Sequence, residues 1–218
     1  MIRRAVTAAA FALIIGTAHA APFDDQLGAI QHNWAIANYQ TEEGGRDAAF
    51  KALIAEAEAF EATFPERAEP RIWHAIVLSS YAGVVGGLGA LDHVKSARDL
   101  LLAAEKIDPD ALAGSTYTSL GSLYYKVPGW PVGFGDGDKA RAYLEKALAL
   151  NPDGIDPNYF YGDYLLEEGR YPEAIAALER ALNAPARPDR PIADEGRRKE
   201  IQVALAKAKE KAKGGFGW

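Results

Sequence analysis

The chain has 218 residues, no cysteine and a net charge of −6, from 24 lysine and arginine residues against 30 aspartate and glutamate residues. The lack of cysteine excludes disulfide bonds, so packing alone must stabilise the fold. The acidic balance and the lack of a basic run disfavour nucleic acid and anionic lipid as partners, and indicate that the surface charge serves solubility.

The first twenty residues have the three parts of a secretory signal peptide. Arg3 and Arg4 give a positive start, residues 5–16 are apolar, and residues 18–20 (Ala-His-Ala) form a small-x-small cleavage site. We therefore expect a signal peptide over 1–20, cleavage after Ala20 and export to a bacterial periplasm. The alternative is a membrane anchor, which the short apolar stretch and the polar sequence after it disfavour. No cysteine follows the apolar stretch, which excludes a lipid anchor.

The rest of the chain has the composition and periodicity of helices. Alanine, leucine, glutamate, lysine and arginine are abundant and β-branched runs are scarce, which favours helix over strand. Apolar residues recur at offsets of three and four positions nearly throughout. These patterns predict an all-α fold of helical hairpins, in chain order 24–39 with 45–64, 70–85 with 93–107, 112–126 with 138–150, and 157–168 with 171–183.

The last two hairpins repeat one pattern. Gly121 and Gly162 each stand in the first helix of a hairpin, followed in the second helix by alanine and leucine at offsets 0, 4, 7 and 8. Such a period is typical of repeat architectures, in which small residues allow the two helices of a hairpin to approach closely. The pattern resembles the tetratricopeptide repeat, and the positions that carry it are Trp73, Ala97, Leu101, Ala104, Pro109, Ala140, Leu144, Ala147, Leu148, Pro152, Ala174, Leu178, Ala181 and Leu182.

The resemblance implies a short α-solenoid of about four hairpins. We expect this repeat domain over 21–183, a proline- and arginine-rich linker over 184–191 and a capping helix over 192–213, with a disordered tail over 214–218. The alternative is an antiparallel helical bundle with alanine-rich contacts, in which the small residues serve the same close packing.

Two turns are longer than the repeat allows, by about seven or eight residues each. Both insertions, 82–93 and 127–138, are rich in glycine, and the second carries Trp130 and Phe134 between glycines and prolines. One interpretation is a binding loop, because exposed aromatic residues on a rigid scaffold commonly bind partners. The other is an Ω-loop whose aromatic residues pack back onto the repeats. Asp138 is expected to cap the following helix.

The third hairpin, with its inserted turn after Leu-Tyr-Tyr, is also similar to the T components of tripartite ATP-independent periplasmic (TRAP) transporters. That resemblance is short. It implies an alternative function, an accessory solute-handling component of a TRAP-type transporter that binds a small molecule near the two insertions.

No constellation of catalytic residues is evident. After the signal peptide the chain has three histidines, His32, His74 and His93, whose spacing fits no metal-binding motif, and it has no nucleophile elbow or phosphate-binding loop. We therefore expect a protein that is not an enzyme, with no cofactor and no metal.

The tetratricopeptide resemblance implies a concave groove lined by the first helices of the hairpins. Its tyrosines and charged residues suit a protein or peptide partner, or a small polar ligand. In the alternative interpretation these tyrosines only pack. The leading function is therefore an exported, non-enzymatic binding scaffold of the periplasm, with the groove residues His74, Tyr81, Ser122, Tyr125, Lys126, Tyr159, Asp163 and Glu167 and the loop residues Trp130 and Phe134 as candidate contacts.

Overall fold

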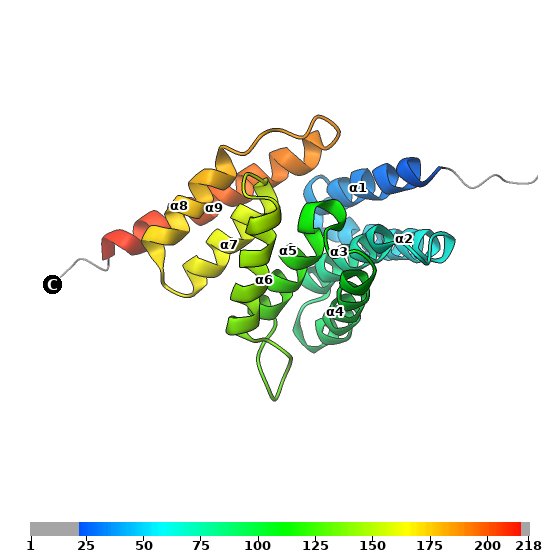
Figure 1. The fold of residues 1–218 in the computed structure, drawn as a ribbon, viewed down its shortest axis with the longest axis horizontal. Helices are drawn as coiled ribbons and strands as arrows, with labels where there is room; N and C mark the ends of the chain where they lie inside the picture. Colours follow the sequence, from blue (N-terminus) through cyan, green and yellow to red (C-terminus); the bar gives the residue numbers. More distant parts are fainter. Residues whose placement is uncertain (1–21, 215–218) are drawn as a thin grey trace, which may run out of the picture.

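The computed structural model describes residues 22–214, which form nine α-helices, one 3₁₀ turn and no strand (Figure 1). The predicted signal peptide and almost all of the predicted tail lie outside this range. No helix within it is long and apolar enough to span a bilayer. The helices are α1 Phe23–Tyr39, α2 Glu43–Thr63, α3 Ala68–Val85, α4 Ala90–Ile107, α5 Ala111–Lys126, α6 Gly137–Leu150, α7 Ile155–Glu167, α8 Tyr171–Leu182 and α9 Pro191–Gly214.

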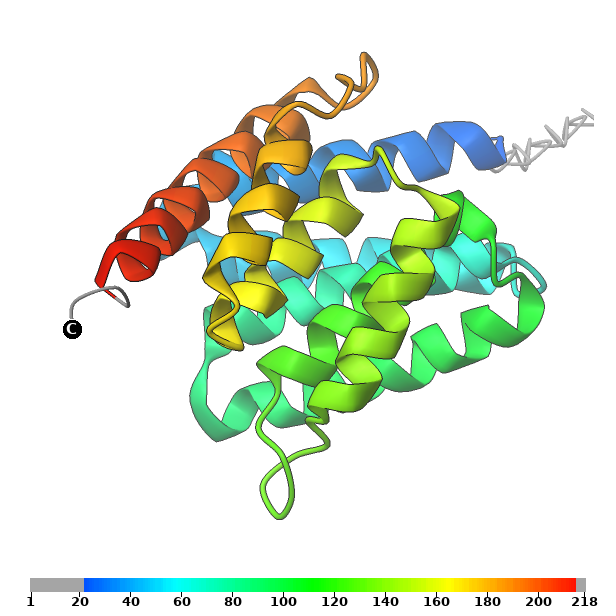
Figure 2. The ribbon, with the colours of Figure 1, turned by 60° about the vertical axis from the view of Figure 1, so that its left-hand side comes forward.

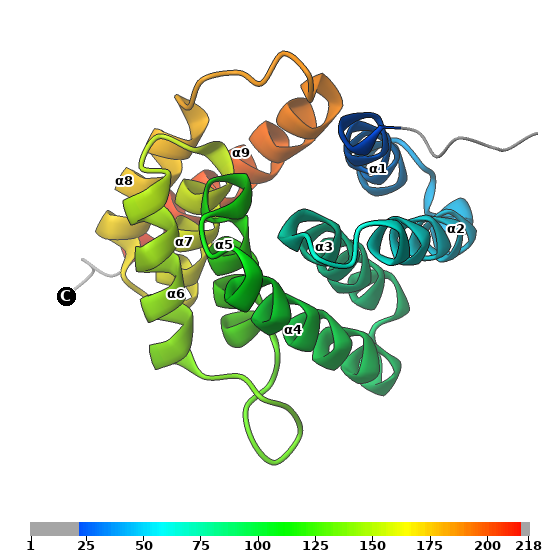
Figure 3. The ribbon, with the colours of Figure 1, turned by 45° about the vertical axis from the view of Figure 1, so that its right-hand side comes forward.

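The first eight helices pair in chain order as four hairpins, which confirms the predicted all-α repeat architecture. α1, α3, α5 and α7 lie on the inner side of the array, and α2, α4, α6 and α8 lie outside them (Figure 3). α9 packs along α8 and α7 and also contacts α1, as Figure 1 shows where its first turns approach that helix. The last helix therefore connects the two ends of the array across its inner side.

Glycine and alanine allow the close approach that the repeat pattern predicted. A Cβ atom built at Gly121 would lie 2.6 Å from Cγ of Leu144, and one at Gly162 would lie 2.7 Å from Cγ of Leu178. No larger residue fits at these positions without moving a neighbouring helix. The alanines of the pattern have no exposed surface: Ala140, Ala147, Ala174 and Ala181.

The two insertions lie at the same end of the hairpins, but the prediction that 82–93 is a long turn was wrong, because residues 82–85 continue α3 and residues 90–93 begin α4. Gly86 and Gly87 adopt positive φ angles between α3 and α4, a conformation that glycine permits at little cost. The turn between α5 and α6 projects as a loop from the body of the protein (Figures 1 and 2). Asp136, not Asp138, caps α6, because its side chain accepts a hydrogen bond from the backbone N–H of Lys139 at 3.1 Å. The expected cap was wrong by two residues, since α6 begins at Gly137.

Candidate functional site

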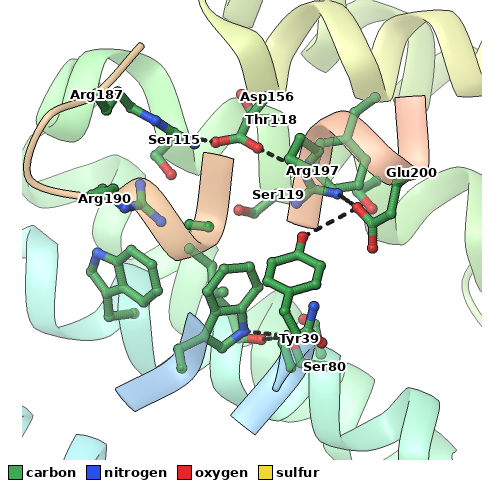
Figure 4. Close-up of a pocket in the computed structure, with 18 of the residues that line it drawn as sticks. Tyr39, Ser80, Ser115, Thr118, Ser119, Asp156, Arg187, Arg190, Arg197 and Glu200 are labelled. Atoms are coloured by element: carbon green, nitrogen blue, oxygen red, sulfur yellow. Dashed lines mark hydrogen bonds and ion pairs between the residues drawn. The ribbon is translucent and has the colours of Figure 1, made fainter. Parts of the chain in front are cut away.

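The inner side of the array encloses a pocket of about 260 Å³, which we call the interior pocket (Figure 4). Every first helix of a hairpin contributes to its wall, and α9 closes it. The wall combines aromatic rings, hydroxyl groups and charged side chains: Trp34, Tyr39, Trp73 and Phe160, then Ser79, Ser80, Ser115, Thr118, Ser119 and Ser122, then Asp156, Arg187, Arg190, Arg197 and Glu200.

Asp156, in the first turn of α7, is the centre of the charged part of the wall. Its carboxylate accepts hydrogen bonds from Nη1 of Arg187 at 2.7 Å and from Nε of Arg197 at 2.8 Å. Burial alone would raise the pKa of this carboxyl, but the charges of the two arginines hold it well below its usual range. Figure 4 shows the two guanidinium groups reaching Asp156 from different segments, so this ion-pair cluster ties α9 and the chain before it to the repeats.

A second pocket of about 390 Å³ adjoins the first. Its remaining wall comes from Gln31 of α1, the first turns of α5 and α7, and the segments that precede α7 and α9. Because the two pockets share part of their wall, the interior pocket extends towards this side of the protein. The shared residues are Trp73, Ser115, Thr118, Asp156, Arg187 and Arg190.

The predicted groove residues of the third and fourth hairpins do come together, but largely by binding one another. Tyr125 donates a hydrogen bond to Oδ2 of Asp163 at 2.8 Å, and burial raises the pKa of that tyrosine well above its usual value. Lys126 pairs with the same carboxylate at 2.8 Å and with Glu167. Tyr159 lies nearby under the guanidinium of Arg197, 4.6 Å from it, and burial raises its pKa to about 12.

The predicted groove residues of the second hairpin lie elsewhere. His74 is buried and its Nδ1 lies 2.8 Å from a carboxylate oxygen of Glu61 on α2. Tyr81 is also buried and donates a hydrogen bond to Asp47 on α2 at 2.9 Å. Both residues thus join α3 to the outer helix of the first hairpin. Ser122 is placed differently, since it lines the interior pocket and also the apolar pocket between the two insertions.

The two loop aromatics have opposite environments. The side chain of Trp130 is 90% exposed, whereas the ring of Phe134 packs edge-on against Tyr124 with 5.6 Å between centroids and lies under the guanidinium of Arg98. The binding-loop interpretation therefore describes the environment of Trp130, and the Ω-loop interpretation describes that of Phe134.

Both insertions carry exposed apolar residues, and we use the name loop surface for Val85, Leu88, Trp130 and Val132. Leu88 is 79% exposed and Val132 is 51% exposed. An apolar pocket of about 670 Å³ lies between the insertions, with Leu88 and Val132 in its wall. Exposed apolar residues that gather beside an apolar pocket commonly mark a site of interaction.

The sequence patterns did not point to the interior pocket. Arg187 and Arg190 lie in the segment interpreted as a linker, and Asp156 precedes the predicted start of its helix. The concentration of arginine between the last hairpin and the last helix was the available signal. Which carboxylate these arginines would pair with depends on where α9 packs, and no local pattern encodes that position.

Metal binding by side-chain clusters finds no support in the geometry. Within residues 22–214 no three histidine, aspartate or glutamate side chains are grouped as metal ligands would be.

Comparisons with known proteins agree on the type of repeat. Residues 132–191 match the family model of the tetratricopeptide repeat. A curated relative, the tetratricopeptide repeat and J domain-containing co-chaperone DNJ1 of Mycosarcoma maydis, is 25% identical over 149 residues, and the match covers 63% of this chain and 25% of that protein. This chain thus corresponds to about a quarter of the relative's length.

Two solved structures are similar in outline. TTC0263, a thermophilic tetratricopeptide-repeat protein of Thermus thermophilus, has 18% identity and a TM-score of 0.45, with 86% of this chain and 98% of that chain covered. The structure of MamA AMB-1 has 21% identity and a TM-score of 0.46, and the match covers 88% of this chain and 98% of that chain. Both likenesses are weak, so the assignment rests on the family model and the packing of the hairpins. Residues 132–191 therefore match the tetratricopeptide repeat and lie within a continuous array of helical hairpins.

Proposed function

We propose that this protein is an exported, non-enzymatic scaffold that binds a partner protein through the loop surface. Tetratricopeptide repeats in general suggest a scaffold for protein interaction. The matched relative is named a co-chaperone, which supports a protein-binding role for the shared repeats. The signal-peptide pattern of residues 1–20 supports export.

The exposure of Trp130 is the observation that carries the proposal. A tryptophan side chain that is 90% exposed contributes no packing to its own fold, and leaving its apolar surface in water is unfavourable. Tryptophan is among the residues that contribute most binding energy at protein interfaces. Leu88 and Val132 are also exposed and line one apolar pocket, so we expect the partner to present an apolar segment of its own.

The loop surface fits a partner better than the predicted groove does. α9 crosses the inner side of the array, where an extended peptide would otherwise lie. The polar groups of Tyr125, Lys126 and Asp163 already bind one another, so a partner would have to displace those contacts. Peptide binding by the groove residues stays a prediction.

The transporter alternative gains no support. The family model and the relatives reported above point to tetratricopeptide repeats, and neither points to a component of a TRAP transporter.

A pull-down from periplasmic extract tests the proposal, with Trp130→Ala compared against a matched exposed residue. Val203 on α9 is 70% exposed and lies away from both insertions, so Val203→Ala is the control. We expect a protein that is retained by wild type and by the Val203 variant but lost with Trp130→Ala and with Leu88→Ala. Equal retention by all four proteins would contradict binding by the loop surface.

A further inference from the structure

The interior pocket has hydrogen-bond donors that its own acceptors do not satisfy. The three carboxylates of its charged cluster are already used: Asp156 by two arginines, Asp194 by Nε of Arg187 at 2.7 Å, and Glu200 by Nη1 of Arg197 at 2.6 Å. Glu200 also accepts a hydrogen bond from the hydroxyl of Tyr39. All three carboxylates of the cluster are therefore already engaged by donors of the chain itself.

Arg190 differs from the other two arginines of the pocket. It has no carboxylate within ion-pair distance among the described residues, and its Nε atom is buried without a hydrogen-bond partner there. Its guanidinium lies over the ring of Trp73 at 5.0 Å. Burial, followed by the charge of Arg187, lowers the pKa of Arg190 more than the surrounding carboxylates raise it, whereas the carboxylates that pair with Arg187 and Arg197 raise the pKa of those two arginines despite their burial. In Figure 4 Arg190 stands apart from the ion pairs around Asp156.

A second unmatched donor lies on the same wall. The indole N–H of Trp73 is buried and has no acceptor among residues 22–214. Trp73 and Arg190 both line the interior pocket and the adjoining pocket. A buried donor without a partner is costly, so two of them beside one cavity call for an acceptor from outside the chain.

The other residues that line the interior pocket indicate which kind of ligand it can bind. Arg187 and Arg197 are paired with carboxylates, whereas Arg190 lines the interior pocket without an ion pair among the described residues, so a ligand with one negative charge would supply its partner. The rings of Trp34, Tyr39 and Phe160 offer apolar surface to the rest of the ligand. A volume of about 260 Å³ admits a small molecule and not a folded segment.

We propose that the interior pocket binds a small monocarboxylate with an apolar body, whose carboxylate pairs with Arg190 and accepts from the indole of Trp73. This site is separate from the loop surface, so the proposed ligand binding and the proposed partner binding can be tested independently.

Calorimetric titration of the purified full chain tests this proposal, with 3-phenylpropanoate, hexanoate and indole-3-acetate as probes. We expect at least one carboxylate to bind and its uncharged amide not to bind. Arg190→Gln should weaken that binding about tenfold or more, as the loss of a charge-assisted hydrogen bond requires. Arg170→Gln is the matched control, since Arg170 is a partly exposed arginine outside the pocket that pairs with Glu173 at the start of α8, and this variant should bind as wild type does.

Ser119→Leu is a second variant, because it keeps Arg190 and fills the pocket with a larger side chain. It should also abolish binding, and circular dichroism should show that both variants keep their helical content. The proposal is overturned if none of the three carboxylates binds, if the amide binds equally well, or if Arg190→Gln and Ser119→Leu both bind as wild type does. Equal binding of inorganic phosphate would overturn the assigned ligand class, because the apolar body would then contribute nothing.

Discussion

Tyr39 of α1 lies directly against Gly196 of α9. A Cβ atom built at Gly196 would fall 2.3 Å from Cγ of the tyrosine, a distance that no real side chain tolerates. The hydroxyl of Tyr39 also donates a hydrogen bond to Glu200, one turn further along α9, at 3.2 Å. This contact joins the first of the described helices to the last, and both helices line the interior pocket.

Gly196→Ala should therefore destabilise the protein, although alanine is the better helix former. The added methyl group must displace Tyr39, at a cost of about 1–3 kcal/mol. Gly28→Ala on α1 is the matched control, because a Cβ there meets nothing within 4 Å, and it should be neutral or stabilising by up to about 1 kcal/mol. Urea unfolding measures both. If the two variants changed stability alike, the contact between α1 and α9 would be absent.

The repeat packing makes a similar comparison possible within α8. Ala174 has no exposed surface, and Ala176, two positions later, is exposed. Ala174→Leu should cost about 1–3 kcal/mol because the helices leave no room, and Ala176→Leu should change the free energy of unfolding by less than about 0.5 kcal/mol. Thermal unfolding followed by circular dichroism measures the difference. A neutral Ala174→Leu would show that the repeat register is wrong.

The fold was largely predictable because each hairpin carries its own local signals. The leucine that packs on Gly162 stands in the same hairpin, so the repeat spacing sufficed to predict the contact. The position of α9 across α1 was not predictable, since it depends on one glycine and one tyrosine 157 positions apart, Gly196 and Tyr39, that no periodicity relates. The interior pocket follows from that contact, which is why Arg190 was assigned to a linker.

The two aromatic residues of the inserted loop should behave differently when truncated. Phe134→Ala removes a ring that packs against Tyr124 and under Arg98. The free energy of unfolding should fall by about 1–2 kcal/mol, which lowers the melting temperature by several degrees. Trp130→Ala removes an exposed ring and should leave the melting temperature unchanged. Differential scanning calorimetry of both variants tests this, and equal loss of stability would show that Trp130 also packs.

The ion pairs of Asp156 should make stability depend on pH. Its pKa is held below the unfolded value of about 4, so its contribution is complete above that pH and is lost as the pH falls below it. Asp156→Asn should cost about 1–3 kcal/mol at pH 7, and the gap from wild type should narrow below pH 4. The exposed Asp153→Asn serves as control. A gap that stayed constant from pH 7 to pH 3 would contradict the role given to the carboxylate.

If the protein is exported and its signal peptide is cleaved, the exported form should have one defined N-terminal residue. The protein recovered from the periplasm should begin at Ala21, because residues 18–20 have the pattern that signal peptidase cleaves. N-terminal sequencing provides the test. Recovery of the intact chain, beginning at Met1, in a membrane fraction would contradict export by a cleaved signal.

Site-specific photo-crosslinking in the periplasm can show whether the loop surface binds a partner protein. A photoreactive phenylalanine analogue at position 130 would sit at the exposed tip of the inserted loop, and the same analogue at position 203 would sit on the exposed face of α9. We expect one discrete crosslinked protein at position 130 that is absent at position 203 and is suppressed by Leu88→Ala. No adduct at position 130, or the same adducts at both positions, would contradict it.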